Sequence, residues 1–416
     1  MTARAARKPA VGFIFITLVL IVLGFGILIP IIPNLVKQFQ GGDVSAASGD
    51  YGLLVGVYAA MQFTFAPILG SLSDRFGRKK VLLIALAGSA IDYVVMGLSP
   101  NMSWLFVARM ISGATAGALS TCNAYIADVT PPEKRSQAYG LLGAAFGIGF
   151  AIGPAIGGWL GGGGHLHRPF FFAAGCVAIN CLYGIFFLPE SLPVENRRSF
   201  SWKRANPVGS LVALRRFRGV FDLALVYFIY MFGTVILQSM WILYTGTRYS
   251  WTVEEAGLSL TYVGVVTAIV QGALIKKIIA VTGDRKGLVI GLSISAVAMV
   301  CYGLATAGWM VYCFVIFGAF GGIAGPSVQA LVTKHVPPNE QGALQGSLAG
   351  LQSLAAIGAP LLGAYSFGLC VGPSARWHLP GVPFFEASFL MLVAMAFAFR
   401  SFVLDDRVQA KLQPTA

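Results

Sequence analysis

Apolar runs, each about as long as a membrane-crossing helix, recur twelve times along this chain of 416 residues. Crossing the hydrocarbon core of a bilayer takes about 20 predominantly apolar residues in a helix. Only 11% of the residues are charged, compared with about a quarter in a soluble protein. The pattern therefore predicts an all-α membrane protein with twelve transmembrane helices. To within a few residues, the predicted spans are 11–36, 50–70, 80–98, 103–125, 137–160, 169–189, 221–244, 257–280, 287–306, 309–332, 343–368 and 383–403.

The lysines and arginines gather on one side of the membrane when the N-terminus is placed in the cytoplasm. On that arrangement 24 of the 29 are cytoplasmic, four lie on the opposite side, and Arg109 falls inside a span. This bias predicts that both termini are cytoplasmic. Together with attraction to anionic lipid, it explains the net charge of +13 without a nucleic-acid partner. The run 11–36 lacks a clear small-x-small cleavage site, so it is predicted to be the first span and not a cleaved signal peptide.

Two segments of the chain resemble each other at a constant spacing. TPPEKRSQAYG begins at Thr130, and VPPNEQGALQG begins at Val336. Four pairs of identical residues lie 206 positions apart: Pro131 and Pro337, Gly140 and Gly346, Pro154 and Pro360, Gly157 and Gly363. Such a repeat indicates duplication of a six-span unit. The chain is therefore predicted to form two pseudo-symmetric six-helix halves, 1–189 and 221–416, joined by a basic cytoplasmic linker at 190–220.

A short, highly charged loop separates the second and third spans. Its sequence, GSLSDRFGRKK, contains Gly70, Asp74, Arg75, Gly77 and Arg78. Gly77 allows a tight turn, and Asp74 can pair with an arginine or accept hydrogen bonds from helix N-termini. A plain positively charged anchor is the alternative interpretation. The second half carries a degraded copy, GALIKKIIAVTGDRK from Gly272, in which Lys276 takes the place of Asp74.

The chain resembles the drug:proton antiporters of the major facilitator superfamily, and most closely the bacterial tetracycline-efflux proteins. The segments that carry the resemblance are the loop 70–80, LLIALAGSAIDYVVMGLSP, LFVARMISGATAGA, AYIADVT, GAAFGIGFAIGPAIGGWLGG and SVQALVTKHVPPNEQGALQGSLAGLQSLAAIGAPLLG. They extend over nearly the whole chain. The resemblance implies a secondary transporter that exports small amphipathic compounds in exchange for protons. Its substrate would bind near the bilayer midplane and reach each side in turn by alternating access.

The resemblance also implies roles for two groups of residues. The loop residues would latch the cytoplasmic helix ends in one state; this group is Gly70, Asp74, Arg75, Gly77 and Arg78, with Asp128 at the end of the fourth span. The antiporter signature of the fifth span is Gly149, Gly153, Pro154 and Gly157. Glycine allows close helix approach and proline introduces a kink. A general helix-packing face is the alternative interpretation of the second group.

Two ionisable residues lie deep within apolar runs, where charge is costly and usually functional. Asp92 in the third span could gain and lose a proton, because burial disfavours a charged carboxylate. Arg109 in the fourth span stays protonated, and the resemblance implies that it assists proton coupling. The two are the predicted proton-coupling residues. A purely structural buried pair is the alternative.

The chain departs from the tetracycline-efflux pattern at three central positions. Ile21 and Ser295 stand where those proteins carry acids, and Thr267 stands where they carry a histidine. Gln271 does match a glutamine of the family. The polar residues predicted to contact a substrate are Asn123, Gln238, Thr267 and Gln271; each could instead hold two helices together. Because so much ionisable chemistry is missing, tetracycline is predicted to be a poor substrate.

Other classes of function find little support in the sequence. An importer or uniporter of the same fold remains an alternative, and so does a receptor that transports nothing. No catalytic cluster and no phosphate-binding loop is evident, so an enzyme or an ATP-driven pump is not expected. His165 and His167 are too few ligands for a metal site. The prediction is a monomer in the bacterial inner membrane that uses protons and a small-molecule substrate but no cofactor.

Overall fold

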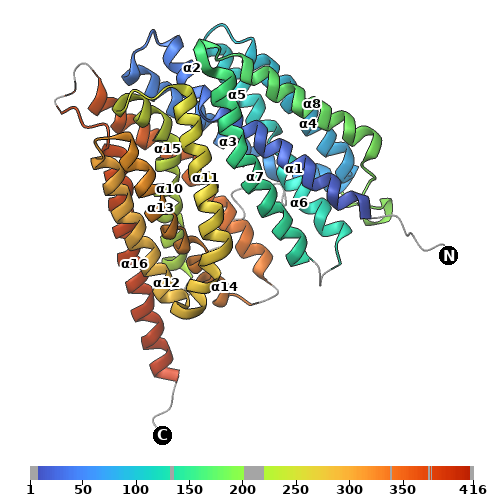
Figure 1. The fold of residues 1–416 in the computed structure, drawn as a ribbon. Coiled ribbons are helices and arrows are strands. Elements are labelled where there is room, and N and C mark those ends of the chain that lie inside the picture. Colours follow the sequence, from blue (N-terminus) through green and yellow to red (C-terminus); the bar gives the residue numbers. More distant parts are fainter. Residues whose placement is uncertain are drawn as a thin grey trace. The chain divides into compact units, whose positions relative to one another are not determined.

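The computed structural model describes residues 8–131, 135–200, 220–337, 340–372, 375 and 377–412, and its regular elements there are helical (Figure 1). The α-helices are α1 (Lys8–Leu28), α2 (Ile31–Phe39), α3 (Val44–Phe76), α4 (Arg78–Gly97), α5 (Met102–Thr115), α6 (Ala118–Val129), α7 (Arg135–Gly161), α8 (Arg168–Phe187), α10 (Phe221–Arg248), α11 (Val253–Ile269), α12 (Ile275–Leu304), α13 (Gly308–Ala319), α14 (Ala324–Lys334), α15 (Gln341–Val371) and α16 (Val382–Leu412). The short elements are the 3₁₀-helices η2 (Gly162–Gly164), η3 (Val194–Asn196) and η6 (Phe320–Ile323) and the π-helix η5 (Val270–Leu274).

Eleven stretches of the described residues are long and apolar enough to cross a membrane. One of them, Val253–Leu304, has 52 residues and covers two predicted spans. A continuous helix of that length would measure roughly 80 Å, whereas the hydrocarbon core is about 30 Å thick. Gly283 interrupts this stretch with φ 73° and ψ 168°. The predicted all-α membrane fold is confirmed, and the predicted count of twelve is close to these eleven stretches, one of which covers two of the predicted spans.

Large apolar side chains are exposed on the outer surfaces of many helices. Phe186 is 76% exposed, Trp159 is 75% exposed and Ile84 is 67% exposed. Exposed apolar patches are unfavourable in water, whereas in a bilayer these side chains contact lipid tails. The surface as well as the sequence is therefore that of a membrane protein.

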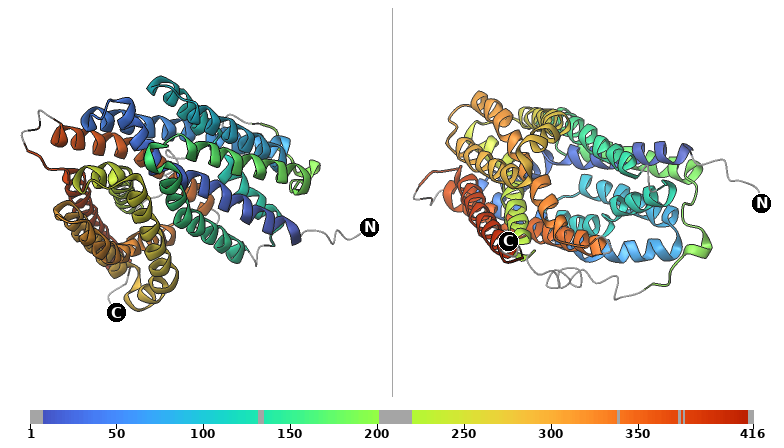
Figure 2. Two further views of the ribbon diagram at one scale, coloured as in Figure 1. Left: turned by 45° about the horizontal axis from the view of Figure 1, so that its top comes forward. Right: turned by 90° about the horizontal axis from the view of Figure 1, so that it is seen from below.

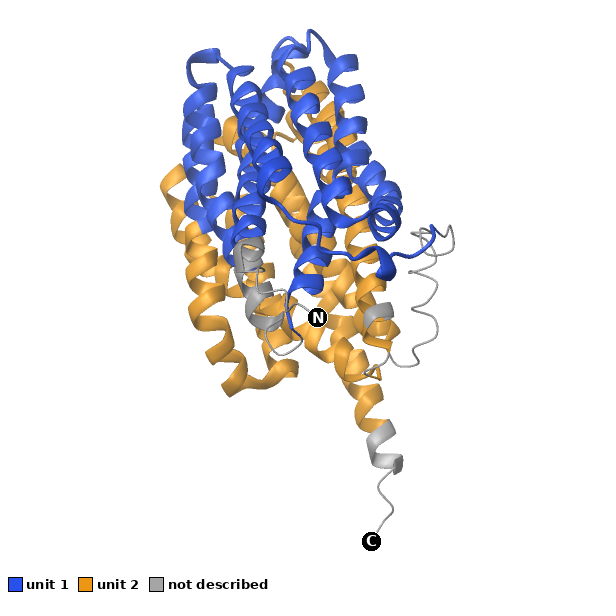
Figure 3. Cartoon of the chain, turned by 90° about the vertical axis from the view of Figure 1, so that its right-hand side faces the viewer, with its two compact units in different colours: residues 1–42, 57–206, 251–264 blue, residues 43–56, 207–250, 265–416 orange. Residues whose placement is uncertain are grey.

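The chain is divided into two compact units (Figure 3). Unit 1 comprises Met1–Gly42, Val57–Asn206 and Trp251–Gly264; unit 2 comprises Asp43–Gly56, Pro207–Ser250 and Val265–Ala416. α3 and α11 therefore contribute residues to both units. Much of the predicted linker, 201–219, lies outside the described residues. The division of the chain into halves 1–189 and 221–416 remains a prediction.

In unit 1, α1 packs along α7 and α8, and α4 packs against α8 and α5 (Figure 2). Buried side chains from α1, α4, α6, α7 and α8 meet in one core cluster, which includes Phe13, Leu18, Leu82, Tyr125 and Val177. The Tyr125 hydroxyl donates a hydrogen bond of 2.8 Å to the Pro189 carbonyl. The ring is thus buried while its polar atom is satisfied.

In unit 2, α10 packs against α15 and α16, and α12 packs against α14 and α16. Aromatic rings lie where α10, α12 and α16 meet. The Tyr244 hydroxyl donates a hydrogen bond of 2.6 Å to the Tyr302 carbonyl, and its ring centre lies 4.6 Å from that of Phe384. Edge-to-face rings at such distances favour one packing arrangement.

Each unit contains a helical segment taken from the other half of the sequence. In unit 2 the start of α3 packs on α15, where the Ser45 and Ser48 hydroxyls donate to the Gly368 and Ala364 carbonyls at 2.9 and 3.1 Å. In unit 1 the start of α11 packs on α7, and a Cβ added at Gly257 would meet the backbone of this helix. We call these two pieces, Asp43–Gly56 and Trp251–Gly264, the exchanged segments.

Candidate functional site

Asp92 and Arg109 lie in the interior of unit 1. Asp92, on α4, is 0% exposed, and Arg109, on α5, is 6% exposed. Within the described residues, neither carboxylate oxygen of Asp92 makes a hydrogen bond of good geometry, and the Ser112 side chain is a weak donor beside it; Nε and Nη2 of Arg109 also lack a partner there. The two groups interact electrostatically without a direct ion pair among the described residues. The structure thus brings the two predicted proton-coupling residues near each other in a buried position.

Tyr58 on α3 is a third member of this cluster. Cζ of Arg109 lies 5.5 Å from the centre of the Tyr58 ring, within the range of a cation–π contact. Gly113 explains how α3 comes so close to α5, since an added Cβ there would meet the Tyr58 carbonyl and the Met61 side chain. No sequence pattern selects this tyrosine, because an aromatic residue in an apolar span is unremarkable by itself.

The predicted latch residues Asp74, Arg78 and Asp128 lie together at the ends of α3, α4 and α6. Arg78 Nη1 lies 2.7 Å from Asp74 Oδ1, and Arg78 Nε donates to Asp128 Oδ2 at 3.0 Å. Arg78 Nη1 also donates to the Ser73 hydroxyl oxygen, and the Ser191 hydroxyl donates to Asp128 Oδ2, each at 3.1 Å. The Arg78 side chain is only 11% exposed, so it joins the three helix ends from a shielded position.

Glu190, just after α8, holds the turn at Gly77. Its Oε1 accepts hydrogen bonds from the backbone N–H groups of Arg78, Ser191 and Leu192 at 2.8, 3.0 and 3.1 Å. A carboxylate at the first residues of α4 also complements the positive end of that helix. Gly77 has φ 100°, and an added Cβ would collide with the Glu190 carboxylate. A residue with a side chain would therefore disrupt this turn.

Two residues of the predicted latch lie outside this cluster. A Cβ added at Gly70 would meet nothing within 4 Å, so no close approach explains this glycine. Arg75 is exposed, and its Cζ lies 5.0 Å from the centre of the Phe76 ring. Neither residue is brought to Arg78 in this structure.

The glycines of the antiporter signature are where α7 touches α1. A Cβ added at Gly149, Gly153 or Gly157 would lie at most 3.0 Å from atoms of α1, including the backbone near Gly26 and Ile27. Pro154 lies against both neighbours: its Cδ lies near Gly26 of α1, and its carbonyl lies against Gly257 of the exchanged segment Trp251–Gly264. The signature therefore gives α7 two close contacts, one with α1 and one with α11.

The predicted substrate-contacting residues are divided between the units. Asn123 is exposed on α6 of unit 1. In unit 2, Gln238 is exposed on α10, Thr267 is half-buried on α11, and Gln271 is exposed on η5. π-helical turns are rare and often occur at functional sites.

Gln271 also faces a second irregular element. An added Cβ on Gly322, in the 3₁₀-helix η6, would lie 2.9 Å from Nε2 of Gln271. The π-turn and the 3₁₀-turn therefore meet at this amide.

At three positions this chain lacks the ionisable residues of the tetracycline-efflux proteins. At two of them the side chain packs against its neighbours. Ile21 lies against the core cluster of unit 1. Ser295 is 8% exposed, and the close approach of Gly321 covers it. Both side chains are taken up in contacts between helices.

The prediction that Lys276 is the counterpart of Asp74 in the second half is wrong. Gly283 repeats the left-handed backbone of Gly77, with φ values of 73° and 100°, and the two lie 206 positions apart, as the other repeated residues do. On this register Lys276 corresponds to Gly70 and not to Asp74. The two loops share few residue types, so residue identity alone gives a register that is four positions out.

No group of three or more His, Cys, Asp or Glu residues is placed to hold a metal ion in the part of the chain that the structure describes. His165 is exposed, and the Nδ1 atom of His167 lies 3.0 Å from the Gly97 carbonyl oxygen. The two histidines do not share a partner in these contacts.

The profile of the Major Facilitator Superfamily matches residues 14–360 and 223–415. Tetracycline resistance protein class C of Escherichia coli is 37% identical over 346 residues, covering 83% of this chain and 86% of that protein. Multidrug resistance protein 2 of Bacillus subtilis (strain 168) is 30% identical over 381 residues, covering 90% of each.

Solved transporter structures have the same fold. The human organic anion transporter MFSD10 (TETRAN) gives a TM-score of 0.71 at 25% identity, covering 95% of this chain and all of that one. A bacterial homologue of the human lysosomal transporter Spinster, in an inward-facing, unoccupied conformation, gives 0.76 at 17% identity, covering 97% and 99%.

Proposed function

Because the chain belongs to the Major Facilitator Superfamily, we propose that it is a proton-coupled exporter of small amphipathic compounds. It is a multi-pass protein of the bacterial inner membrane, related to proteins that confer drug resistance. Transport rather than catalysis is the activity of this superfamily. Proton coupling, export and alternating access are the further steps that we propose.

The observation that carries the proposal is the buried pair Asp92 and Arg109. A buried charge without a partner costs several kcal/mol, whereas a neutral carboxylic acid costs much less. A buried carboxylate such as Asp92, which has only the weak donor Ser112 beside it among the described residues, is suited to take up a proton. Arg109, held against Tyr58, would stabilise the carboxylate when the proton leaves. Proton uptake and release at Asp92 would thus drive the exchange.

Inside-out membrane vesicles test the proposal directly. With an acidic interior, an exporter that exchanges protons should accumulate its substrate, and a protonophore should abolish the accumulation. Accumulation that does not depend on the proton gradient would favour a uniporter. Accumulation only in right-side-out vesicles would favour an importer, and saturable binding without movement would favour a receptor.

We also propose that both termini are cytoplasmic and that one chain is sufficient for transport. The topology rests on the distribution of lysine and arginine. Labelling of single cysteines placed near either terminus, in intact cells and in inside-out vesicles, distinguishes the two orientations. Reconstitution at one chain per liposome tests the monomer.

Asp74→Asn should slow turnover far more than it weakens substrate binding. Asp74 pairs with Arg78 at 2.7 Å at the end of α3 and has no contact with the buried pair. A free-energy change of about 1.4 kcal/mol shifts the equilibrium between two conformations about tenfold. If the loss of the Asp74 charge changes the free energy by about this amount, the transport rate should fall roughly tenfold at constant KM. Lys80→Gln, at an exposed residue of the same loop that is not part of the latch, serves as control and should change neither. Loss of affinity at an unchanged rate would place Asp74 in the substrate site instead.

Expression in a drug-sensitive bacterium should give little tetracycline resistance. A charged, metal-chelated drug needs polar partners to offset its desolvation, and Ile21 and Ser295 are packed side chains instead. We expect the inhibitory concentration of tetracycline to rise at most about twofold, while at least one more apolar compound in a panel shows a large, protonophore-sensitive rise. A large rise for tetracycline would show that the missing groups are dispensable.

A further inference from the structure

The charged loop of the first half has a structural counterpart in the second half, in which the residue after the glycine carries the opposite charge. Gly77 and Gly283 are equivalent in backbone conformation and in the repeat of 206 residues. The next residue is Arg78 in one loop and Asp284 in the other. The residue that pairs with it is correspondingly an acid in unit 1 and a cation in unit 2.

The two ion pairs occupy equivalent positions. In unit 1, Arg78 Nε lies 3.0 Å from Asp128 Oδ2. In unit 2, Lys334 Nζ lies 2.5 Å from Asp284 Oδ2. Asp128 and Lys334 are again 206 positions apart. Each pair joins the residue after a left-handed glycine to the end of a neighbouring helix, α6 or α14, but the acid and the cation have changed places.

The loop member is the more shielded one in both pairs. The side chain of Arg78 is 11% exposed and that of its partner Asp128 is 22% exposed, while Asp284 is 16% exposed and its partner Lys334 is 66% exposed. A shielded charge needs a partner of opposite sign more than an exposed charge does. The sign of the loop residue therefore determines which partner is acceptable at the helix end.

The following loop residue makes a second equivalent contact, to the last helix of its half. Lys79 Nζ donates to the Ile185 carbonyl on α8 at 2.9 Å. Its counterpart Arg285 donates to Asp405 and Asp406 on α16 at 3.2 and 2.6 Å. In both units, two adjacent loop residues thus tie the loop to two different helices.

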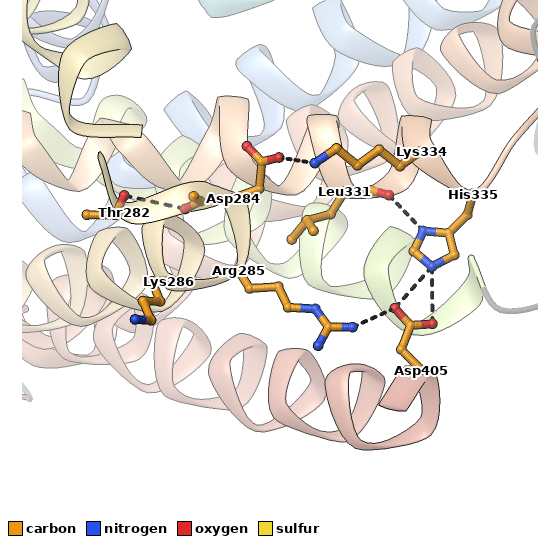
Figure 4. A pocket seen from close by; sticks show the side chains of 9 residues that line it. Thr282, Asp284, Arg285, Lys286, Leu331, Lys334, His335 and Asp405 are labelled. Carbon is orange, nitrogen blue, oxygen red and sulfur yellow. Dashed lines mark hydrogen bonds and ion pairs between the residues drawn. The ribbon is translucent and has the colours of Figure 1, made fainter. Parts of the chain in front are cut away.

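His335 completes the connection in unit 2 (Figure 4). Its Nδ1 lies 2.8 Å from the Leu331 carbonyl oxygen, and its Nε2 lies 3.1 Å from both oxygens of Asp405. A ring that carries a proton on Nε2 donates to the Asp405 carboxylate. Asp405 therefore holds α12 and α14 together by accepting from Arg285 and His335.

We propose, on the basis of the transport function proposed above, that Asp284 and Lys334 form a second latch of inverted polarity. Together with Arg285, His335 and Asp405, this pair makes the break in α12, the end of α14 and α16 move as one body. These are positioning residues for the transport cycle, since no substrate needs to touch them. The cations that make the contacts are matched by carboxylates, which favours a latch over a site for an anionic ligand.

Charge reversal tests the second latch. The variants of the full-length chain are Asp284→Lys, Lys334→Asp and the double variant. A cavity of about 660 Å³ beside these residues leaves room for the longer side chain. Each single variant places two like charges together, so we expect turnover to fall about tenfold with KM changed less than twofold. In the double variant the pair is restored with the polarity of unit 1, and turnover should return to within about twofold of the original.

The matched control is the reversed pair in unit 1, Arg78→Asp with Asp128→Arg. This double variant should recover less, because Arg78 also contacts Asp74 and an aspartate in place of Arg78 would repel that acid. Single variants in unit 2 that transport normally would overturn the second latch. So would a double variant no better than the worse single one.

The melting temperature of the purified protein separates two kinds of failure. If the double variant regains its melting temperature but not its turnover, the pair is structural only and the latch is wrong. If the original protein transports nothing, the proposed function fails, while recovery of the melting temperature still shows whether residues 284 and 334 pair.

Discussion

Asp92→Asn should abolish proton-driven transport while the protein still folds and inserts. An asparagine at this position would keep the size of the side chain but could not release or take up a proton. Asp92 is fully buried, and the Ser112 side chain, the weak donor beside it, can also donate to the side-chain oxygen of an asparagine, so the substitution should leave the fold intact. We expect at least about a hundredfold loss of accumulation driven by a pH gradient, since a single proton carrier has no substitute. Uptake into inside-out vesicles measures it.

A matched substitution and a second assay make this result specific. Asp43→Asn changes an exposed acid whose carboxylate caps α3 by accepting from the N–H groups of Ser45 and Ala46. Asparagine caps helices equally well, so this variant should transport normally. Substrate exchange at equal pH on both sides should persist in Asp92→Asn. If pH-driven accumulation also persisted, Asp92 would not be the proton carrier.

Gly157→Val should separate α1 from α7 and stop transport. A Cβ at Gly157 would collide with the Ile27 carbonyl oxygen and lie 2.9 Å from the carbonyl carbon. These are backbone atoms, so no side chain can move aside. Overpacking of a well-packed interface costs about 1–3 kcal/mol, and valine adds two further methyl groups. We expect a lower melting temperature and a transport rate reduced at least about tenfold.

Gly147→Val on the same helix provides the control. A Cβ added at Gly147 would meet nothing within 4 Å, although the change in helix propensity is the same. This variant should melt and transport nearly as the original protein does. If the two variants behaved alike, the contact between α1 and α7 at Gly157 would not explain the glycine-rich sequence.

The hydropathy pattern predicted the helices well because the bilayer leaves few choices. A backbone in lipid has to satisfy its own hydrogen bonds, so an apolar run of the right length becomes a helix. The same reasoning selected Asp92 and Arg109, since charge within such a run is rare. Their mutual approach was not predictable from the sequence, because it depends on how closely α4 packs against α5, where a Cβ added at Gly88 would collide with Thr115.

Other parts of the site depend on long-range packing and left little trace in the sequence. Tyr58 became relevant only because Arg109 lies against its ring. The π-turn at Gln271 has no residue signature, since it arises where α11 continues into α12. The register of the loop at Gly283 was predicted wrongly, because its backbone conformation is retained while the residue before the glycine and most of the preceding helix end share no residue type with the first loop.

The exchanged segments have a consequence for how this protein is made. During synthesis, Asp43–Gly56 emerges from the ribosome long before α15, its partner: Ser48 and Ala364 are separated by 316 residues. At typical elongation rates of about 5–20 residues per second, this segment waits roughly 15–60 s for its partner. Unit 1 likewise stays incomplete until Trp251–Gly264 has been translated. Neither unit can therefore finish folding when only one half of the chain has been translated. A ribosome that stalls between the halves would leave the face of α7 that packs against Trp251–Gly264 without its partner.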